Sequence, residues 1–264
     1  MNFENKTALS TGAASGMGLL FSQNFAALGG NVVMCDVNEA VLNEKVAEIN
    51  AQNKGRAIGI VCDVRDYAQV CAARDQAIAA FGRIDVLVNF AGGASARVHK
   101  VDKTKYPELP DVPIEVYEWG LDVNLKGQLF CAHAIMKEME KQMSGLVITI
   151  GSITGEEGSA NAVAYSTAKS AAVTGLTKSL AQAGAPYNIR CVGVAPGPVL
   201  TRANMQNMKT LSGKAAEPGE LVELMLFIAS GRCDALNGTY ILADCGRNVM
   251  FDKVHGDNGK YDNK

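Results

Sequence analysis

The sequence lacks the features that would assign it to a membrane, a disulfide-linked secreted scaffold or a metal site. Residues 1–6 contain no apolar signal core, and no apolar run approaches the roughly 20 residues of a membrane-spanning helix. None of the seven cysteines lies in a Cys-x-x-Cys pair, and the three histidines are far apart in the sequence. We therefore expect a soluble, cytoplasmic protein with reduced, buried thiols and no metal.

Charge of one sign is also missing. The chain has 25 Lys and Arg against 27 Asp and Glu, a formal net charge of −2 at pH 7. Nothing in this balance indicates a nucleic acid or an anionic membrane as partner, so small acids and neutral molecules remain open. Apolar residues make up 48% of the 264 residues, which is enough for a sizeable core.

Apolar segments of strand length alternate with segments of helix length along the whole chain, as in βαβ units with a parallel sheet. The predicted strands are 7–10, 31–35, 57–62, 86–89, 147–150, 190–194 and 239–242. The predicted helices are 17–28, 39–50, 67–81, 115–143, 162–183 and 219–229. We expect an α/β protein with one doubly wound, seven-stranded parallel sheet and helices on both faces.

Two polar segments interrupt this alternation. Residues 92–113 contain Pro107, Pro110 and Pro113, which predict a long loop. Residues 252–264 predict a polar tail, loosely ordered unless a neighbouring subunit holds it. Because no linker, repeat or low-complexity tract divides the rest, residues 1–251 are expected to form one domain that includes the substrate site.

A glycine-rich segment, Thr-Gly-Ala-Ala-Ser-Gly-Met-Gly at 11–18, joins the first predicted strand to the first predicted helix. Glycines allow a tight turn and let backbone N–H groups reach a pyrophosphate at the helix N-terminus. The Gly-x-x-x-Gly-x-Gly spacing is a variant of the dinucleotide pattern, and a P-loop is disfavoured because the Lys-Ser/Thr pair is absent. An ordinary strand-to-helix turn is the alternative.

Asp36 ends the second predicted strand, eighteen residues after Gly18. A carboxylate at this place accepts hydrogen bonds from both ribose hydroxyls and repels a 2′-phosphate. No arginine or lysine stands at Ala14, Val37 or Asn38 to attract such a phosphate. The predicted cofactor is NAD rather than NADP, with a turn-forming aspartate as the alternative.

Tyr165 and Lys169 are four residues apart in a predicted helix, so they share one helix face. A neighbouring ammonium favours the phenolate and can lower a tyrosine pKa from about 10 by roughly 1–3 units. Tyr165 would then carry protons near neutral pH. In isolation such a pair is more often a half-buried tyrosine and a solvated lysine.

Taken together, these segments resemble the short-chain dehydrogenase/reductase family, from about Lys6 to Gly246. Residues 11–18 match the family's Thr-Gly-x-x-x-Gly-x-Gly loop, and 89–92 match its Asn-Asn-Ala-Gly with Phe90 at the second position. The family's catalytic Asn, Ser, Tyr and Lys are matched by Asn124, Ser152, Tyr165 and Lys169. The resemblance implies a Rossmann fold and an oxidoreductase.

The resemblance also implies a role for each matched residue. Ser152 would hold the substrate oxygen, Tyr165 would exchange its proton, and Lys169 would favour the phenolate and bind the nicotinamide ribose. Asn124 would place a water that links Lys169 to solvent. Asp63 and Val64 would contact the adenine. The predicted cofactor-binding residues are Gly12, Ser15, Gly16, Met17, Gly18, Asp36, Asp63, Val64, Asn89, Ala91, Tyr165, Lys169, Pro196, Val199 and Thr201.

The substrate is less well defined by the sequence. The segment between 197 and 218 is short for a substrate lid, so recognition is expected in the long loop at Ser95, Arg97 and His99. The other predicted pocket residues are Thr154, Glu156, Asn161, Val199 and Met205, a mixture that selects neither a sugar nor a steroid. A 3-oxoacyl carrier substrate is disfavoured, because such family members usually use NADPH and Asp36 argues for NAD.

The first hypothesis is therefore an NAD-dependent oxidoreductase that interconverts a secondary alcohol and a ketone. The alternative is a dinucleotide-binding sensor or scaffold without turnover, although all four catalytic groups are in place. Because the family commonly pairs the helices at 115–143 and 162–183 across a two-fold axis, we expect a homotetramer, with a dimer next.

Overall fold

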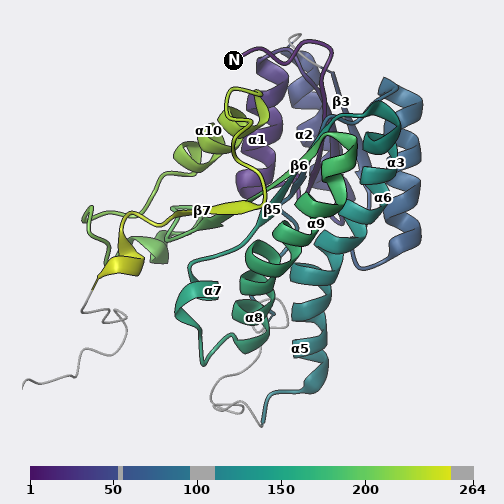
Figure 1. The fold of residues 1–264 in the computed structure, drawn as a ribbon. Coiled ribbons are helices and arrows are strands. Elements are labelled where there is room, and N and C mark those ends of the chain that lie inside the picture. The colour runs from purple at the N-terminus through teal and green to yellow at the C-terminus, as the bar shows by residue number, and fades with distance from the viewer. Residues whose placement is uncertain (53–55, 96–110, 251–264) are drawn as a thin grey trace, which may run out of the picture.

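The computed structural model describes residues 1–52, 56–95 and 111–250 and contains one seven-stranded sheet (Figure 1). All strand pairs are parallel, in the order β3-β2-β1-β4-β5-β6-β7. The strands are β1 (Thr7–Thr11), β2 (Asn31–Asp36), β3 (Arg56–Val61), β4 (Val86–Asn89), β5 (Gly145–Ile150), β6 (Ile189–Pro196) and β7 (Thr239–Ala243). The predicted doubly wound Rossmann fold is confirmed.

Helices cover both faces of the sheet and create two separate apolar cores (Figure 1). On one face lie α1 (Gly16–Ala27), α2 (Glu39–Ala51) and α10 (Pro218–Ala229); on the other lie α3 (Tyr67–Phe81), α6 (Gly127–Gln142) and α9 (Thr177–Gly184). Phe21 and Met225 belong to the first core, and Leu87 and Met139 to the second. Strands buried on both faces read as continuous apolar runs, which is why the sequence pattern located them.

Local signals in the sequence fix several helix ends. Asp66 caps α3 by accepting hydrogen bonds from the N–H groups of Ala68 and Gln69. A reciprocal capping pair, Glu217 and Glu220, begins α10.

Three further α-helices of the described residues lie beyond the carboxyl ends of the strands (Figure 1). They are α5 (Ile114–Leu121), the short α7 (Thr154–Glu157), which the sequence pattern did not predict, and α8 (Val163–Ala171). The strand order reverses between β1 and β4: β2 and β3 lie on one side of β1, and β4 to β7 lie on its other side. Ligands of doubly wound sheets bind at such a reversal, outside the carboxyl ends of the strands.

The two longest predicted helices, 115–143 and 162–183, each contain a π-helical turn that the prediction did not include. The turn η2 (Asp122–Lys126) joins α5 to α6, and η3 (Ala172–Leu176) joins α8 to α9. Such turns add one residue to a helical turn and are frequent at functional sites. Helical periodicity in the sequence does not resolve a shift of one residue.

Side chains stabilise both π-turns by binding carbonyl groups nearby. The Asn124 amide donates to the Gly120 carbonyl at 2.8 Å. The Thr177 hydroxyl donates to the Ala172 carbonyl at 2.8 Å and is hydrogen-bonded to the hydroxyl of Thr149 in β5. Each turn is thus held by a specific polar side chain.

Some predictions fall outside the described residues. These are the loop segment 96–110, with Arg97 and His99, and the tail at 252–264. Within the described ranges, no helix is both long enough and apolar enough to cross a membrane. All seven cysteines are free thiols.

Candidate active site

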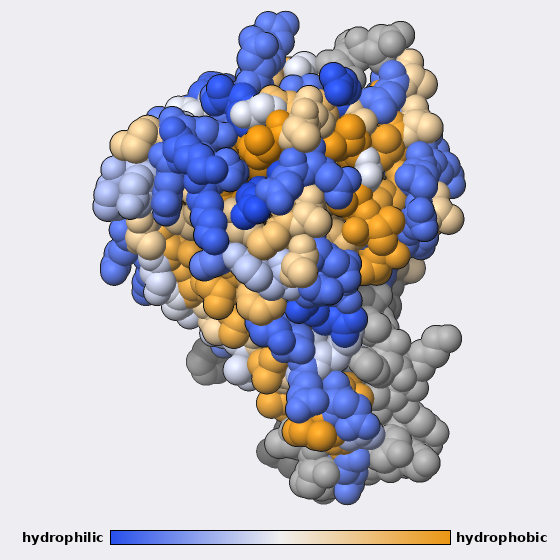
Figure 2. Space-filling view, turned by 90° about the vertical axis from the view of Figure 1, so that its right-hand side faces the viewer, coloured by the Kyte–Doolittle hydropathy of each residue, from blue (hydrophilic) through white to orange (hydrophobic). Residues whose placement is uncertain are grey.

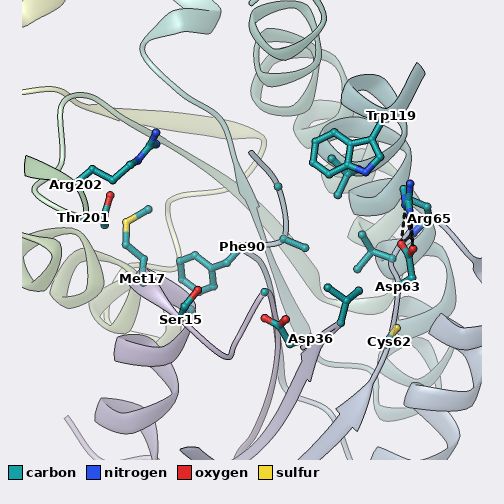
Figure 3. A pocket seen from close by; sticks show the side chains of 18 residues that line it. Ser15, Met17, Asp36, Cys62, Asp63, Arg65, Phe90, Trp119, Thr201 and Arg202 are labelled. Atoms are coloured by element: carbon teal, nitrogen blue, oxygen red, sulfur yellow. Dashed lines mark hydrogen bonds and ion pairs between the residues drawn. The ribbon is translucent and has the colours of Figure 1, made fainter. Parts of the chain in front are cut away.

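A cavity of about 680 Å³ opens at the carboxyl ends of β1, β2 and β4, at the reversal of strand order (Figure 3). Its volume is typical of a cofactor or ligand site. Its lining residues are Gly12, Ser15, Gly16, Met17, Gly18, Asp36, Val37, Cys62, Asp63, Val64, Arg65, Phe90, Ala91, Gly92, Trp119, Val123, Thr201 and Arg202.

The glycine loop lines this cavity, and two of its glycines leave no room for a side chain. A Cβ at Gly12 would lie 2.9 Å from Ala91 Cα, and one at Gly18 would lie 2.4 Å from the Gly12 carbonyl oxygen. Gly16 has φ +57°, and a Cβ there would meet no atom within 4 Å, so it faces open space at the start of α1. The N-cap Ser15 makes no side-chain capping bond, which leaves N–H groups of the first turn for an anion. The loop thus fits a pyrophosphate.

Asp36 is held at the edge of the cavity by two backbone donors. Its Oδ2 accepts from the Ala14 N–H and its Oδ1 from the Asn38 N–H, both at 3.0 Å. A carboxylate has about four acceptor positions, so both oxygens can still bind hydroxyl groups. The geometry fits a ribose at the end of β2.

The adjacent wall contains an ion pair and an indole. Arg65 pairs with Asp63, with 2.5 Å between Nη2 and Oδ2, and this hydrogen-bonded guanidinium lowers the pKa of Asp63. Trp119 of α5 lies on the same side of the cavity, above Arg65 in Figure 3. Val64 is buried there and packs closely on Gly127 at the start of α6.

Eight lining residues are absent from the predicted cofactor site. They are Val37, Cys62, Arg65, Phe90, Gly92, Trp119, Val123 and Arg202. Most are sequence neighbours of predicted residues, which is a usable signal. Trp119 and Val123 are four residues apart, so they share a helix face next to Asn124.

Lys169 and Tyr165 lie one turn apart in α8. The Lys169 Nζ is 5.7 Å from the centroid of the Tyr165 ring and donates to the Ile150 carbonyl at 3.0 Å. Tyr165 is half-buried, whereas Lys169 is 3% exposed. Burial lowers the pKa of Lys169 to about 8, because the charged form loses its hydration.

Asn124 joins the η2 turn to the loop after β4 and is fully buried. Its Oδ1 accepts from the Gly93 N–H and its Nδ2 donates to the Gly93 carbonyl, both at 3.0 Å. A Cβ at Gly92 would lie 2.5 Å from Asn124 Oδ1 and 3.3 Å from Lys169 Nζ. Asn124 and Lys169 therefore meet at the backbone of Gly92.

Ser152 lies two residues after the end of β5. Its Oγ accepts from the Thr154 hydroxyl at 2.9 Å and from the Thr154 N–H at 3.3 Å. A Cβ at Gly155 would lie 2.7 Å from the Ser170 nitrogen, so this turn packs directly on α8. The structure thus gathers Ser152 and the Asn124, Tyr165 and Lys169 elements around the end of β5.

The other predicted cofactor residues surround these groups. Pro196 ends β6, Val199 pairs with Ala216 in an isolated bridge, and Thr201 lines the cavity. The Ala91 N–H donates to the Thr11 hydroxyl at 3.1 Å. Asn89 is buried and its Nδ2 donates to the Ile148 carbonyl at 3.3 Å.

The predicted substrate residues that the structure describes are not among those that line the main cavity. Ser95 is buried against Gly120 of α5, and Thr154 is bound to Ser152. Glu156 is exposed and accepts from the Tyr240 hydroxyl of β7 at 2.8 Å. The last two are Asn161, which is exposed, and Met205, which is half-buried in the short helix η5 (Ala203–Asn207). In the described part of the chain, no cluster of His, Cys, Asp and Glu could hold a metal ion.

Comparisons with known proteins point to one family. A family model described as short chain dehydrogenase matches residues 6–212. Cis-4-hydroxycyclohexanecarboxylate dehydrogenase from Sinomonas cyclohexanicum is 33% identical over 256 residues, which cover 92% of this chain and 97% of that protein.

Two solved structures are similar over nearly their whole length. A 3-oxoacyl-[acyl-carrier protein] reductase from Brucella melitensis with bound NAD has a TM-score of 0.81 at 28% identity, covering 92% of this chain and 91% of that one. A 7α-hydroxysteroid dehydrogenase complexed with NADH and 7-oxo glycochenodeoxycholic acid has a TM-score of 0.81 at 27% identity, covering 93% and 95%.

Proposed function

The chain belongs to the short-chain dehydrogenase family, and on that premise we propose that it uses NAD to interconvert a secondary alcohol and a ketone. The observation that carries the proposal is the buried Lys169 ammonium beside the Tyr165 ring at the end of β5. A buried cation next to a phenol, packed against Gly92 of the cavity wall, supports proton transfer coupled to redox chemistry.

The choice of NAD rests on Asp36, whose carboxylate would accept ribose hydroxyls and repel a 2′-phosphate. Two similar proteins support it, since one was solved with NAD and the other with NADH. The loop at 12–18 would hold the pyrophosphate, with Asp63 and Val64 beside the adenine and Thr201 near the nicotinamide. Bound NAD would supply the acceptor for the hydride that leaves the carbinol carbon.

The chain's own residues would handle the oxygen and its proton. The Ser152 hydroxyl would donate to the substrate oxygen, and Tyr165 would take the alcohol proton during oxidation or return it during reduction. With a pKa of about 8, Lys169 is mostly protonated at neutral pH, so its charge favours the phenolate. Asn124 would keep the Gly92 backbone against Lys169.

The substrate class remains broad within secondary alcohols. The similar 3-oxoacyl-[acyl-carrier protein] reductase holds NAD. A preference for NAD therefore does not count against a 3-oxoacyl substrate, contrary to the expectation from the sequence. An assay panel should therefore combine cis-4-hydroxycyclohexanecarboxylate, a 7α-hydroxysteroid, a polyol and a 3-hydroxyacyl thioester.

We also propose a homotetramer, with a dimer as the next choice. Leu121 and Leu129 of the long α5–α6 helix are 39% and 43% exposed. Viewed from the side of α3 and α6, apolar patches lie between polar residues on this face (Figure 2). Burial of such patches favours association of copies. A monomer in light scattering would contradict the proposal. The cytoplasmic location stays a prediction.

The test of the reaction is Tyr165→Phe. Loss of the phenol should lower kcat for NADH formation by about 10²–10⁴-fold, because the alcohol proton loses its acceptor. NAD affinity, measured by calorimetry, should stay close to wild type. Tyr187→Phe, which removes an exposed phenol from the short helix η4 (Ala185–Tyr187), is the matched control.

Full turnover by Tyr165→Phe would overturn the mechanism. Tight NAD binding without NADH formation from any alcohol in the panel would instead favour the sensor or scaffold alternative.

A further inference from the structure

Gln128 connects the η2 turn to the end of β5. It lies in the first turn of α6, four residues after Asn124, and is 1% exposed. Its Nε2 donates to the Asn124 carbonyl at 2.7 Å and to the Ile150 carbonyl at 3.0 Å. Its Oε1 accepts from the Ile150 N–H at 2.9 Å. One buried amide thus satisfies three backbone groups.

The Ile150 carbonyl is the acceptor that Gln128 shares with Lys169. The Lys169 Nζ and the Gln128 Nε2 each lie 3.0 Å from this oxygen. The two nitrogens are therefore near each other. A carbonyl oxygen with two lone pairs is saturated by these two donors. Inside a protein the electrostatic effect of one donor on the hydrogen bond of the other is stronger than in water, because the effective dielectric constant is lower.

We propose that Gln128 is a positioning residue, which fixes the Asn124 and Ile150 carbonyls and thereby sets how strongly the Lys169 ammonium is held. The proposal rests on the proposed function, because it assigns Gln128 to the proton half of that reaction. Gln128 is not among the residues that line the cavity, and its hydrogen bonds reach Asn124 and Lys169 through the Asn124 and Ile150 carbonyls, so it would act through these two residues.

The described groups around Lys169 come from several elements. Its own helix supplies the Tyr165 ring, η2 supplies the neutral Asn124, the loop after β4 supplies Gly92, and β5 supplies the Ile150 carbonyl. Burial is the cause that lowers the Lys169 pKa. When a second donor shares the oxygen, that oxygen is a weaker acceptor for the ammonium. Loss of the Gln128 amide should therefore raise the pKa of Lys169.

The chain provides a matched control at the other end of α6. Gln142 accepts from the Ile84 N–H at 3.0 Å and donates to the Ile84 carbonyl at 2.9 Å, which is the same kind of bridge from α6 to one backbone residue, here just before β4. It lies outside the cavity. Gln142→Met and Gln128→Met therefore remove equivalent hydrogen bonds from one helix, but only the second change reaches Lys169.

The first measurement needs no turnover. The Cε resonance of Lys169 in ¹³C-lysine-labelled protein, identified by its loss in Lys169→Arg, is titrated with pH in the wild type and both variants. We expect Gln128→Met to raise the titration midpoint by about one pKa unit, and Gln142→Met to leave it unchanged. The pH profile of kcat should shift in the same direction in Gln128→Met only.

A second variant keeps the test decisive if Gln128→Met does not fold. Gln128→Glu keeps the size of the side chain and the acceptor for the Ile150 N–H, while it places a carboxylate near Lys169. Gln128→Glu should raise the Lys169 titration midpoint further than Gln128→Met, because a nearby carboxylate favours the ammonium. A wild-type midpoint in whichever variant folds would overturn the proposal. Absence of NAD-dependent activity in the wild type would instead refute the proposed function, and the resonance titration would still test Gln128.

Discussion

Lys169→Met should change the pH dependence of stability in a calculable way. Burial lowers the pKa of Lys169 from its ordinary 10.5 to about 8. The unfolded chain then binds this proton more tightly than the folded one, which opposes folding by about 3 kcal/mol at pH 7. The folded pKa is the lower one, so stability is greatest above 10.5 and is lost as the pH falls from there to about 8. Between pH 7 and pH 9 the free energy of unfolding should therefore increase by about 1 kcal/mol.

Urea unfolding followed by circular dichroism at several pH values tests this expectation. The free energy of unfolding of the wild type minus that of Lys169→Met should rise by about 1 kcal/mol from pH 7 to pH 9. Burial also raises the pKa of the Cys131 and Cys191 thiols, but these titrate alike in both proteins and cancel in the difference. Lys178→Met, which removes an exposed lysine of α9, is the control and should give a flat difference.

A flat difference for Lys169→Met as well would refute the reasoning. It would mean that the ammonium is hydrated in the folded protein, and the argument that its charge acts strongly on Tyr165 would fail with it.

Two further substitutions test the cofactor site and the packing near β7. Asp36→Ser should lower the preference for NAD over NADP, measured as the ratio of kcat/KM values, by about tenfold to a hundredfold, because charged hydrogen bonds to ribose are lost; an unchanged ratio would contradict the role of Asp36. Arg247 is fully buried, binds Glu157 at 3.2 Å and donates to the Lys209 carbonyl at 3.0 Å. Arg247→Met should lower the free energy of unfolding by about 3–5 kcal/mol. Adding Glu157→Gln should restore part of this loss, because the buried carboxylate is then neutral. A smaller loss in the single variant than in the double variant would argue against the ion pair.

Elements with signals in their own sequence were predicted closely. The helix α3 and the strand β4 begin and end at the predicted residues. Asp66 caps the start of α3, and Gly82, with φ +73°, ends it. Both signals are local, so they are legible without knowledge of the fold.

The π-turns were not predictable in the same way, because tertiary contacts stabilise them. Gln128 binds Ile150 and Thr177 binds Thr149, and both partners are in β5. The sequence separation is more than twenty residues in each case. Periodicity within one helix carries no information about such contacts.

The candidate site shows the same division. The glycine loop, Asp36 and the Tyr165–Lys169 pair are short motifs that can be recognised in the sequence. That they lie near one another follows from the order of the strands in the sheet. By contrast, Trp119 reaches the cavity from α5, and Glu156 binds Tyr240 of β7. These contacts depend on how distant elements pack, which a single sequence does not display.

Trp119 also has an optical consequence. The chain contains one tryptophan, and its half-buried indole lines the cavity. All indole emission from this protein therefore originates at one wall of the cleft. A reduced nicotinamide absorbs where indole emits, so its arrival in the cleft would quench that light by energy transfer. The protein thus contains a built-in fluorophore, and filling of the cleft can be followed in real time without any label.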